Sequence, residues 1–192
     1  MRRIISRKDE LKKKKRNQWI LGVVLVIVMF GSVFGIVANS FGKKDSDEVK
    51  YNGYSFVPQS GYWSLNLGDF NFFFKNNPLE TQNLSLEDSE IEIISHYQSK
   101  PLYLYSEDYS ASNEIYQNIG PFVERIQQAC LTEENCTGDL PIKSCEDNFI
   151  QISISEENKL FQDKNCVFIE GKEEDLLKVT DEFLFKVLGI KQ

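Results

Sequence analysis

The stretch that decides the fold is Phe149-Ile-Gln-Ile-Ser-Ile154, in which isoleucines alternate with polar residues. A period of two is typical of a β-strand with one buried face. A second strand is predicted for Cys166-Val-Phe-Ile169, and Gly171 interrupts the chain soon after it. The last third of the sequence therefore contains two strands ahead of a final helix.

This final helix is the best-defined helix of the second half. Its apolar face follows three- and four-residue steps and consists of Leu176, Leu177, Phe183, Leu184, Val187 and Leu188. We expect Glu173, Glu174 and Asp175 in its first turn, where acids interact favourably with the helix dipole. Gly189 is the expected C-terminal cap, and Ile190 is the apolar contact that follows it.

A second helix is predicted upstream from the recurrence of Ile115, Ile119, Phe122, Ile126 and Cys130. Gly120-Pro121 must kink or split this helix, because proline removes a backbone donor and clashes with the preceding turn. We expect the helix on both sides of that break.

The first half of the globular region indicates strands separated by turns. The turn signals are Asn52-Gly53 and Gly68-Asp69, and the predicted strands cover residues 51–56, 61–67, 70–74, 91–97 and 101–105. This order of elements predicts an α+β domain with a mainly antiparallel sheet and two helices packed on one face.

Aromatic residues are concentrated in these strands. Phe72, Phe73 and Phe74 are consecutive, so one face of a strand cannot hold all three. We expect a core on both faces of this strand, and the alternative is a surface that binds a partner.

The 192 residues carry a net charge of −7, but the charges are segregated. Residues 1–18 contain nine Lys/Arg and two acids, residues 19–38 contain no charge, and residues 39–192 contain 13 Lys/Arg and 27 acids. An acidic domain repels phosphate backbones, which argues against a nucleic-acid partner.

The uncharged stretch Trp19–Ala38 predicts a transmembrane helix, since 20 residues at about 1.5 Å each span the hydrocarbon of a bilayer. The basic cluster before it places residues 1–18 in the cytoplasm, and the domain after the linker 39–50, residues 51–192, outside the cell membrane. A cleaved signal peptide is the alternative. Gly31 and Gly35 fit the G-x-x-x-G pattern of helix dimers, which would make a homodimer.

The four cysteines, Cys130, Cys136, Cys145 and Cys166, all lie on the predicted outer side. An even number in one compartment indicates two disulfides. Three pairings are possible, and we favour Cys130–Cys136, from a helix end to a loop, with Cys145–Cys166 between neighbouring strands. A zinc site is disfavoured because no C-x-x-C spacing occurs.

Other candidate sites are few. Asn83 and Asn135 begin glycosylation sequons. Asp45-Ser-Asp47 resembles the start of a calcium loop without its glycine, and the single His96 carries no catalytic motif. We therefore assign no catalytic residue, cofactor or metal ligand, and interpret the many acids as a solvated surface.

Features of the last third carry a family resemblance. They are the spacing Cys130-x5-Cys136, the segments Pro141–Cys145, Asp147-Asn148 and Asn165–Ile169, and the closing stretch Asp181–Ile190. With the anchor-plus-domain layout, they resemble uncharacterised single-pass archaeal membrane proteins over roughly residues 128–190. The resemblance implies an archaeal cell membrane with the domain outside, and it brings no function with it.

The leading hypothesis is a non-enzymatic domain, tethered by one helix, that binds or scaffolds another envelope protein. A pilin-like subunit is the alternative, although no processing glycine precedes Trp19. A third hypothesis is an envelope hydrolase that uses paired carboxylates, which requires two acids converging in a cleft.

Overall fold

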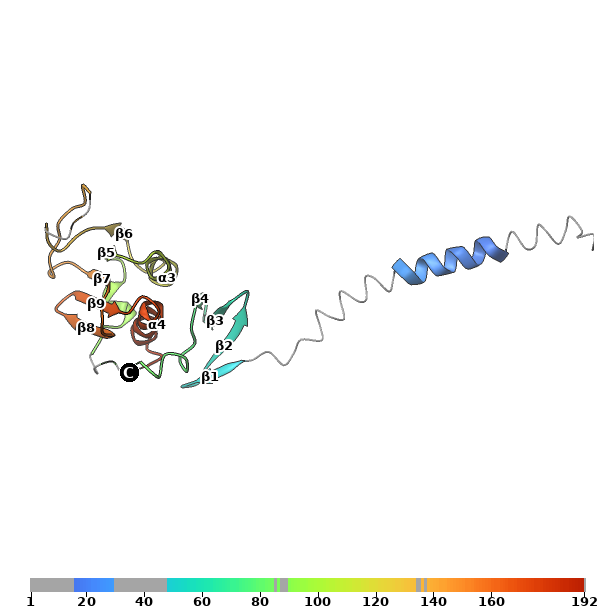
Figure 1. Cartoon of the computed structure of the whole chain (residues 1–192), viewed down its shortest axis with the longest axis horizontal. Coiled ribbons are helices and arrows are strands. Elements are labelled where there is room, and N and C mark those ends of the chain that lie inside the picture. Colours follow the sequence, from blue (N-terminus) through green and yellow to red (C-terminus); the bar gives the residue numbers. More distant parts are fainter. Residues whose placement is uncertain are drawn as a thin grey trace, which may run out of the picture. The chain divides into compact units, whose positions relative to one another are not determined.

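The structure is a computed structural model that describes residues 16–29, 48–84, 86, 90–133, 136 and 138–191 (Figure 1). The chain divides into two compact units, Met1–Ser46 and Asp47–Gln192. In the first unit, residues 16–29 form a helix. Among the described residues, no helix is both long and apolar enough to cross a membrane. Residues 30–38 of the predicted span, with Gly31 and Gly35, lie outside the described residues, as do Asp45 and Asp47.

The second unit has α+β architecture with two sheets. One sheet is antiparallel, in the order β1-β2-β3-β4, and the other has the order β6-β5-β7-β9-β8. The elements in chain order are β1 (Val49–Tyr51), β2 (Tyr54–Gln59), β3 (Tyr62–Leu67), β4 (Phe70–Phe74), α2 (Ile94–Tyr97), β5 (Pro101–Ser106), α3 (Tyr109–Ile119), β6 (Arg125–Gln128), β7 (Phe149–Ile154), β8 (Lys159–Asp163), β9 (Cys166–Gly171) and α4 (Leu176–Val187).

The four-stranded sheet confirms the predicted turns. Asn52 and Gly53 both have positive φ, as a tight two-residue hairpin requires, and they join the paired residues Tyr51 and Tyr54. Gly68 likewise has positive φ in the turn between β3 and β4. The short first strand begins at Val49, directly before this hairpin.

The five-stranded sheet corrects the expectation of a mainly antiparallel sheet. β6, β5, β7 and β9 are parallel to their neighbours, and only β8 runs antiparallel, beside β9. The helix α3 connects β5 to β6 as a crossover, which is how adjacent parallel strands are joined. Side-chain alternation indicates which face of a strand is buried but not the direction of its neighbour.

The helices α3 and α4 lie between the two sheets and bury the core on both sides (Figure 1). Phe185 of α4 contacts Phe56 and Phe74 of the antiparallel sheet, with ring centroids 5.8 and 4.9 Å apart. The same core includes Ile150 and Ile152 of the other sheet. The prediction of two helices on one face of one sheet was therefore incomplete. The two helices pack against the five-stranded sheet on one side and the antiparallel sheet on the other.

Two predicted elements are wrong. Residues 91–97 were predicted as a strand, but they contain the short helix α2, in which Tyr97 is buried. The next strand, β5, begins four residues after this helix ends. The upstream helix ends at Ile119, and the chain beyond Pro121 forms the parallel strand β6. The three- to four-residue spacing that predicted one helix thus spans a helix, a turn and a strand. The strand β8 was not predicted.

The phenylalanine run is divided between the two faces of β4. Phe72 and Phe74 are buried in the core, while Phe73 is partly exposed on the opposite face. Asn118 of α3 holds the Phe73 backbone by accepting from its N–H at 3.0 Å and donating to its carbonyl at 2.8 Å. The amide thereby takes the place of a neighbouring strand along this edge.

The end of α4 agrees with its predicted cap. Gly189 has positive φ, and its N–H donates to the Lys186 carbonyl while the Ile190 N–H donates to that of Phe185. The beginning differs from the prediction, because Glu173 and Glu174 precede the helix and Asp175 is its N-cap residue. Asp175 instead pairs with Lys178 at 2.9 Å.

Candidate binding site on the outer face of the five-stranded sheet

The candidate site lies on the face of the five-stranded sheet that is turned away from the helices. Strand register aligns Tyr105 of β5, Gln151 of β7, Phe168 of β9 and Phe161 of β8 in one row. Side chains at alternate positions share a face, so Leu104, Ile150 and Ile152 point to the helices and this row points outward. The rings of Phe161 and Phe168 stack at 4.8 Å.

Part of this outer face is covered by the segment that connects β6 to β7. There Tyr103, Ala129, Phe149 and Cys166 form a second, smaller core. The segment is fastened by the disulfides Cys130–Cys136 and Cys145–Cys166, which confirms the favoured pairing. Cys130 follows a strand rather than a helix, however, and Cys145 lies in the connecting segment rather than in a strand.

Beside this segment, and partly lined by it, lies an open pocket of about 520 Å³. Its walls include two aromatic rings and four polar side chains, namely Tyr105, Phe168, Glu107, Thr132, Gln151 and Ser153. A second hollow of about 230 Å³ shares Tyr105 and extends towards Ser112 and Asp139. The volume and the mixture of apolar and polar walls are typical of ligand sites. We refer to the larger hollow as the outer-face groove.

The position of the groove in the fold also favours binding. From β5 the chain passes to β6 on one side, and it later returns to β7 on the other side of β5. Ligands of open parallel sheets bind at the carboxyl ends of strands where the strand order reverses in this way. Tyr105, Glu107 and Ser153 come from the carboxyl ends of β5 and β7.

Glu107 is oriented by the sheet itself. Its backbone N–H donates to the Ile152 carbonyl at 3.0 Å, and its Oε2 accepts from the Ile154 N–H at 2.8 Å. The next residue, Asp108, caps α3 by accepting from the Ala111 N–H at 2.6 Å. The carboxylate is therefore held at the rim of the groove before any ligand arrives.

Two basic side chains already contact Tyr103 on this face. Arg125 Nη2 donates to the Tyr103 hydroxyl at 3.5 Å. The ammonium of Lys143 lies 4.1 Å from the ring centroid of Tyr103 and 3.7 Å from an oxygen of Asp147. The neighbouring Lys143 ammonium lowers the pKa of the Tyr103 hydroxyl. On this face, an aromatic ring and a nearby carboxylate thus bind a positive charge together.

The paired-carboxylate hypothesis points to a different place, the contact between α3, α4 and the end of β4. There Glu114 and Asp181 are both buried. Glu114 Oε1 accepts from the Lys75 N–H at 2.9 Å, and Asp181 Oδ2 accepts from the N–H and the side-chain amide of Asn76, both at 2.8 Å. The two carboxyl groups also interact with each other.

Both of these acids have a raised pKa. Burial raises the pKa of Glu114 to about 11, and the Asp181 carboxyl adds to that effect. Burial raises the pKa of Asp181 to about 6. Glu114 Oε2 and Asp181 Oδ1 have no donor among the described groups, so a proton on Glu114 satisfies the contact between the pair.

The pair is arranged to hold β4 rather than to act on a substrate. A hollow of about 250 Å³ adjoins Glu114 and is also lined by Lys75. A glycosidase needs its two carboxyl groups about 5–10 Å apart with a substrate between them. Here the two groups interact with each other, and each also binds the backbone of residues 75–76.

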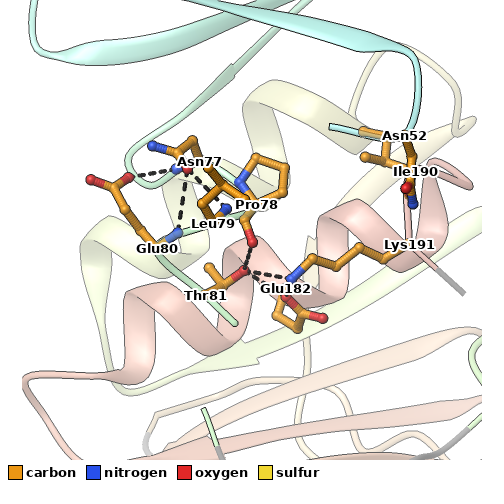
Figure 2. A network of polar contacts seen from close by, with 9 residues as sticks. All are labelled: Asn52, Asn77, Pro78, Leu79, Glu80, Thr81, Glu182, Ile190 and Lys191. Atoms are coloured by element: carbon orange, nitrogen blue, oxygen red, sulfur yellow. Dashed lines mark hydrogen bonds and ion pairs between the residues drawn. The ribbon is translucent and has the colours of Figure 1, made fainter. Parts of the chain in front are cut away.

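A third buried polar cluster joins the end of the chain to the loop after β4 (Figure 2). Lys191 Nζ lies 2.5 Å from Glu182 Oε2 and donates to Thr81 Oγ1 at 2.8 Å, and that hydroxyl donates to Glu182 Oε2 at 2.7 Å. Asn52 donates to the Ile190 carbonyl beside it at 3.0 Å. All these polar groups are satisfied within the protein, which indicates a structural role.

The remaining sequence candidates do not meet in one site. His96 Nε2 lies 3.0 Å from the Asn148 side-chain oxygen, which ties α2 to the start of β7. Asn83 is exposed in a turn, and Asn135 lies outside the described residues. Sequence analysis missed Tyr105, Glu107, Gln151 and Phe168 as a group, although alternation places the first, third and fourth opposite the core.

Comparison with known proteins adds no relative. No family model matches the chain, and neither a curated protein nor a solved structure is significantly similar to it.

Proposed function

We propose that this protein is a membrane-anchored, extracytoplasmic domain that binds or scaffolds another envelope protein through the outer-face groove, without catalysing a reaction. The groove carries the proposal, because it combines two aromatic rings, hydrogen-bonding groups and an oriented carboxylate at the reversal point of a parallel sheet. Its volume of about 520 Å³ is about twice that of the hollow beside Ser112 or of the hollow beside Glu114.

The location rests on three features of the sequence. The uncharged stretch 19–38, the basic cluster before it and the resemblance to archaeal single-pass proteins support an anchor with the domain outside. Two disulfides are consistent with an oxidising compartment. Non-reducing peptide mapping of the protein from its own membranes tests this placement, and free thiols at all four cysteines would contradict it.

The buried acids argue against the hydrolase alternative. Glu114 and Asp181 converge, as that alternative requires, but they bind the backbone of residues 75–76 and each other. An acid pair engaged in this way does not place a general acid and a nucleophile on opposite sides of a substrate. Binding is therefore the function that the described residues support best.

Site-specific photocrosslinking in intact membranes tests the proposal. A photoreactive residue replaces Gln151 in the groove, and the control replaces Val57, which is exposed on the outer face of the antiparallel sheet. We expect one envelope protein to crosslink at 151 and not at 57. The purified partner should then bind the full-length chain at least about tenfold more weakly after Tyr105→Ala, as the loss of a central aromatic contact predicts. Identical crosslinks at both positions, or none at 151, would refute it.

A further inference from the structure

The outer-face groove has a chemistry that selects one class of ligand. Tyr105 and Phe168 supply two aromatic rings, and Glu107 supplies the carboxylate among the residues that line the groove. Aromatic rings attract cations through the negative charge of their faces, and a carboxylate adds a direct charge interaction. Gln151, Ser153 and Thr132 add hydrogen-bonding groups without a positive charge.

The protein contains an internal precedent for this arrangement. On the same face of β5, two residues before Tyr105, Tyr103 lies beneath the Lys143 ammonium at 4.1 Å, and Asp147 is its carboxylate partner. Tyr105, at the next outward-facing position of β5, and Glu107 likewise bring a ring and a carboxylate to the lining of the groove. Among the described residues, no lysine or arginine lies over the Tyr105 ring.

The net charge of the whole domain also favours a cationic ligand. Residues 39–192 contain 27 acids and 13 Lys/Arg, so the domain attracts cations and repels anions. An anionic ligand would meet Glu107 at the rim of the groove. A neutral ligand would leave unused the carboxylate that the Ile154 N–H holds in place.

We propose that the outer-face groove binds a basic segment of a partner protein, with an arginine side chain stacked on the Tyr105 ring and paired with Glu107. Arginine fits better than lysine because its planar guanidinium stacks on a ring while donating two parallel hydrogen bonds to a carboxylate. This inference rests on the proposed function and adds the chemistry of the partner.

The test measures peptide binding to the full-length chain in detergent by fluorescence anisotropy at low and at physiological salt. The probe is a labelled Gly/Ser peptide with two arginines, and the matched peptide carries citrulline, which has the same shape without the charge. We expect at least about tenfold tighter binding of the arginine peptide, in the range of a desolvated cation–π contact with a charge pair.

Variants locate the interaction. Tyr105→Leu and Glu107→Gln should each weaken arginine-peptide binding by about five- to tenfold. The controls are Tyr109→Leu, at a ring that is 84% exposed, and Asp69→Asn, in the turn between β3 and β4; both should change binding less than twofold. Gln151→Arg places a cation in the groove itself and should abolish binding. Circular dichroism confirms that each variant is folded.

Several outcomes would overturn the inference. The first is equal affinity for the arginine and citrulline peptides. The second is tighter binding of the arginine peptide that Glu107→Gln and Asp69→Asn weaken equally, because this would show attraction by net charge alone. Binding of a neutral oligosaccharide that Tyr105→Leu abolishes would assign the groove to sugars. If the groove crosslinks one envelope protein but arginine peptides do not bind, the inference of a basic partner segment is refuted and the proposed binding function stands. If position 151 gives no crosslink, the binding function itself fails.

Discussion

Asp181 and Glu182 are neighbours on α4, both are buried, and the protein compensates them in opposite ways. Asp181 faces another acid, Glu114, whose pKa is raised to about 11 so that it carries a proton at neutral pH. Glu182 pairs directly with a lysine, Lys191, and Thr81 binds both (Figure 2). Both acids bind the helix to the segment that follows β4. The burial of one acid is compensated by a proton and that of the other by a lysine.

The difference teaches how a buried acid responds to its surroundings. A buried charge without a partner is costly, and either neutralisation or pairing removes that cost. Neutralisation of an acid by a proton makes the stability of the fold depend on pH. Pairing of an acid with a lysine makes the stability depend on the presence of that lysine. The two clusters therefore predict different failures, which separate experiments can measure.

Removal of the lysine should have the largest effect. Lys191→Met leaves Glu182 buried without its cation, and we expect a loss of about 3–5 kcal/mol in the free energy of unfolding. Urea denaturation of the full-length chain in detergent measures it, with Lys172→Met on the surface as the control. The double variant Lys191→Met with Glu182→Leu should recover most of the loss. A small effect of Lys191→Met alone would show that the ion pair is not needed.

Removal of the ionised acid should have the next largest effect. Asp181→Leu leaves the Asn76 N–H and side-chain amide without their acceptor, for an expected loss of about 1–3 kcal/mol. Asp181→Asn keeps an acceptor oxygen at this position and should lose less. The same denaturation measurement compares the two variants. Equal losses would mean that packing at position 181, and not hydrogen bonding, is important.

The buried acid pair Glu114 and Asp181 predicts a dependence of stability on pH. The pKa of both acids is raised on folding, so the folded state binds more protons and stability falls as the pH rises above about 4. For Asp181 this loss is complete above its raised pKa of about 6, and Glu114 extends it to higher pH. Glu114→Gln supplies a permanent amide donor in place of the proton.

We therefore expect Glu114→Gln to flatten the decline in stability between pH 4.5 and 7 by up to about 1.4 kcal/mol per pH unit, the value for one proton. Denaturation midpoints of wild type and variant across this range measure the slope. Asp69→Asn, at an exposed acid in the turn between β3 and β4, is the control and should keep the wild-type slope. Parallel curves for wild type and Glu114→Gln would show that the protonation of Glu114 does not contribute to this decline.

The smallest expected effect is at the Thr81 hydroxyl, which binds both the lysine and the acid. Thr81→Val keeps the shape but removes the group that accepts from Lys191 and donates to Glu182, for a loss of about 1 kcal/mol. Thermal unfolding at constant pH measures it. In the Lys191→Met background this change should cost less, because the network is already broken. Additive losses would show that the hydroxyl acts independently of the ion pair.

Much of the local structure could be predicted from the sequence. Alternation in Phe149–Ile154 and 61–67 indicated strands that the structure contains, and Asn52-Gly53 and Gly189 marked a turn and a cap correctly. Prediction failed at residues 115–130, where apolar spacing continued from α3 through a turn into β6. Periodicity cannot distinguish one helix from a helix and a strand that both contribute to the same core.

The sequence by itself determined the segregation of charge, the strands with one buried face, the caps and turns, and the four cysteines available for two bonds. Tertiary structure alone decided that the second sheet is parallel, which acids are buried, and that Tyr105, Gln151 and Phe168 lie in one row. The reason is distance along the chain. Asn76 meets Asp181 across 105 residues and Lys191 meets Thr81 across 110. Local patterns indicate which face of an element is buried, whereas its partner is chosen only when the layers pack together.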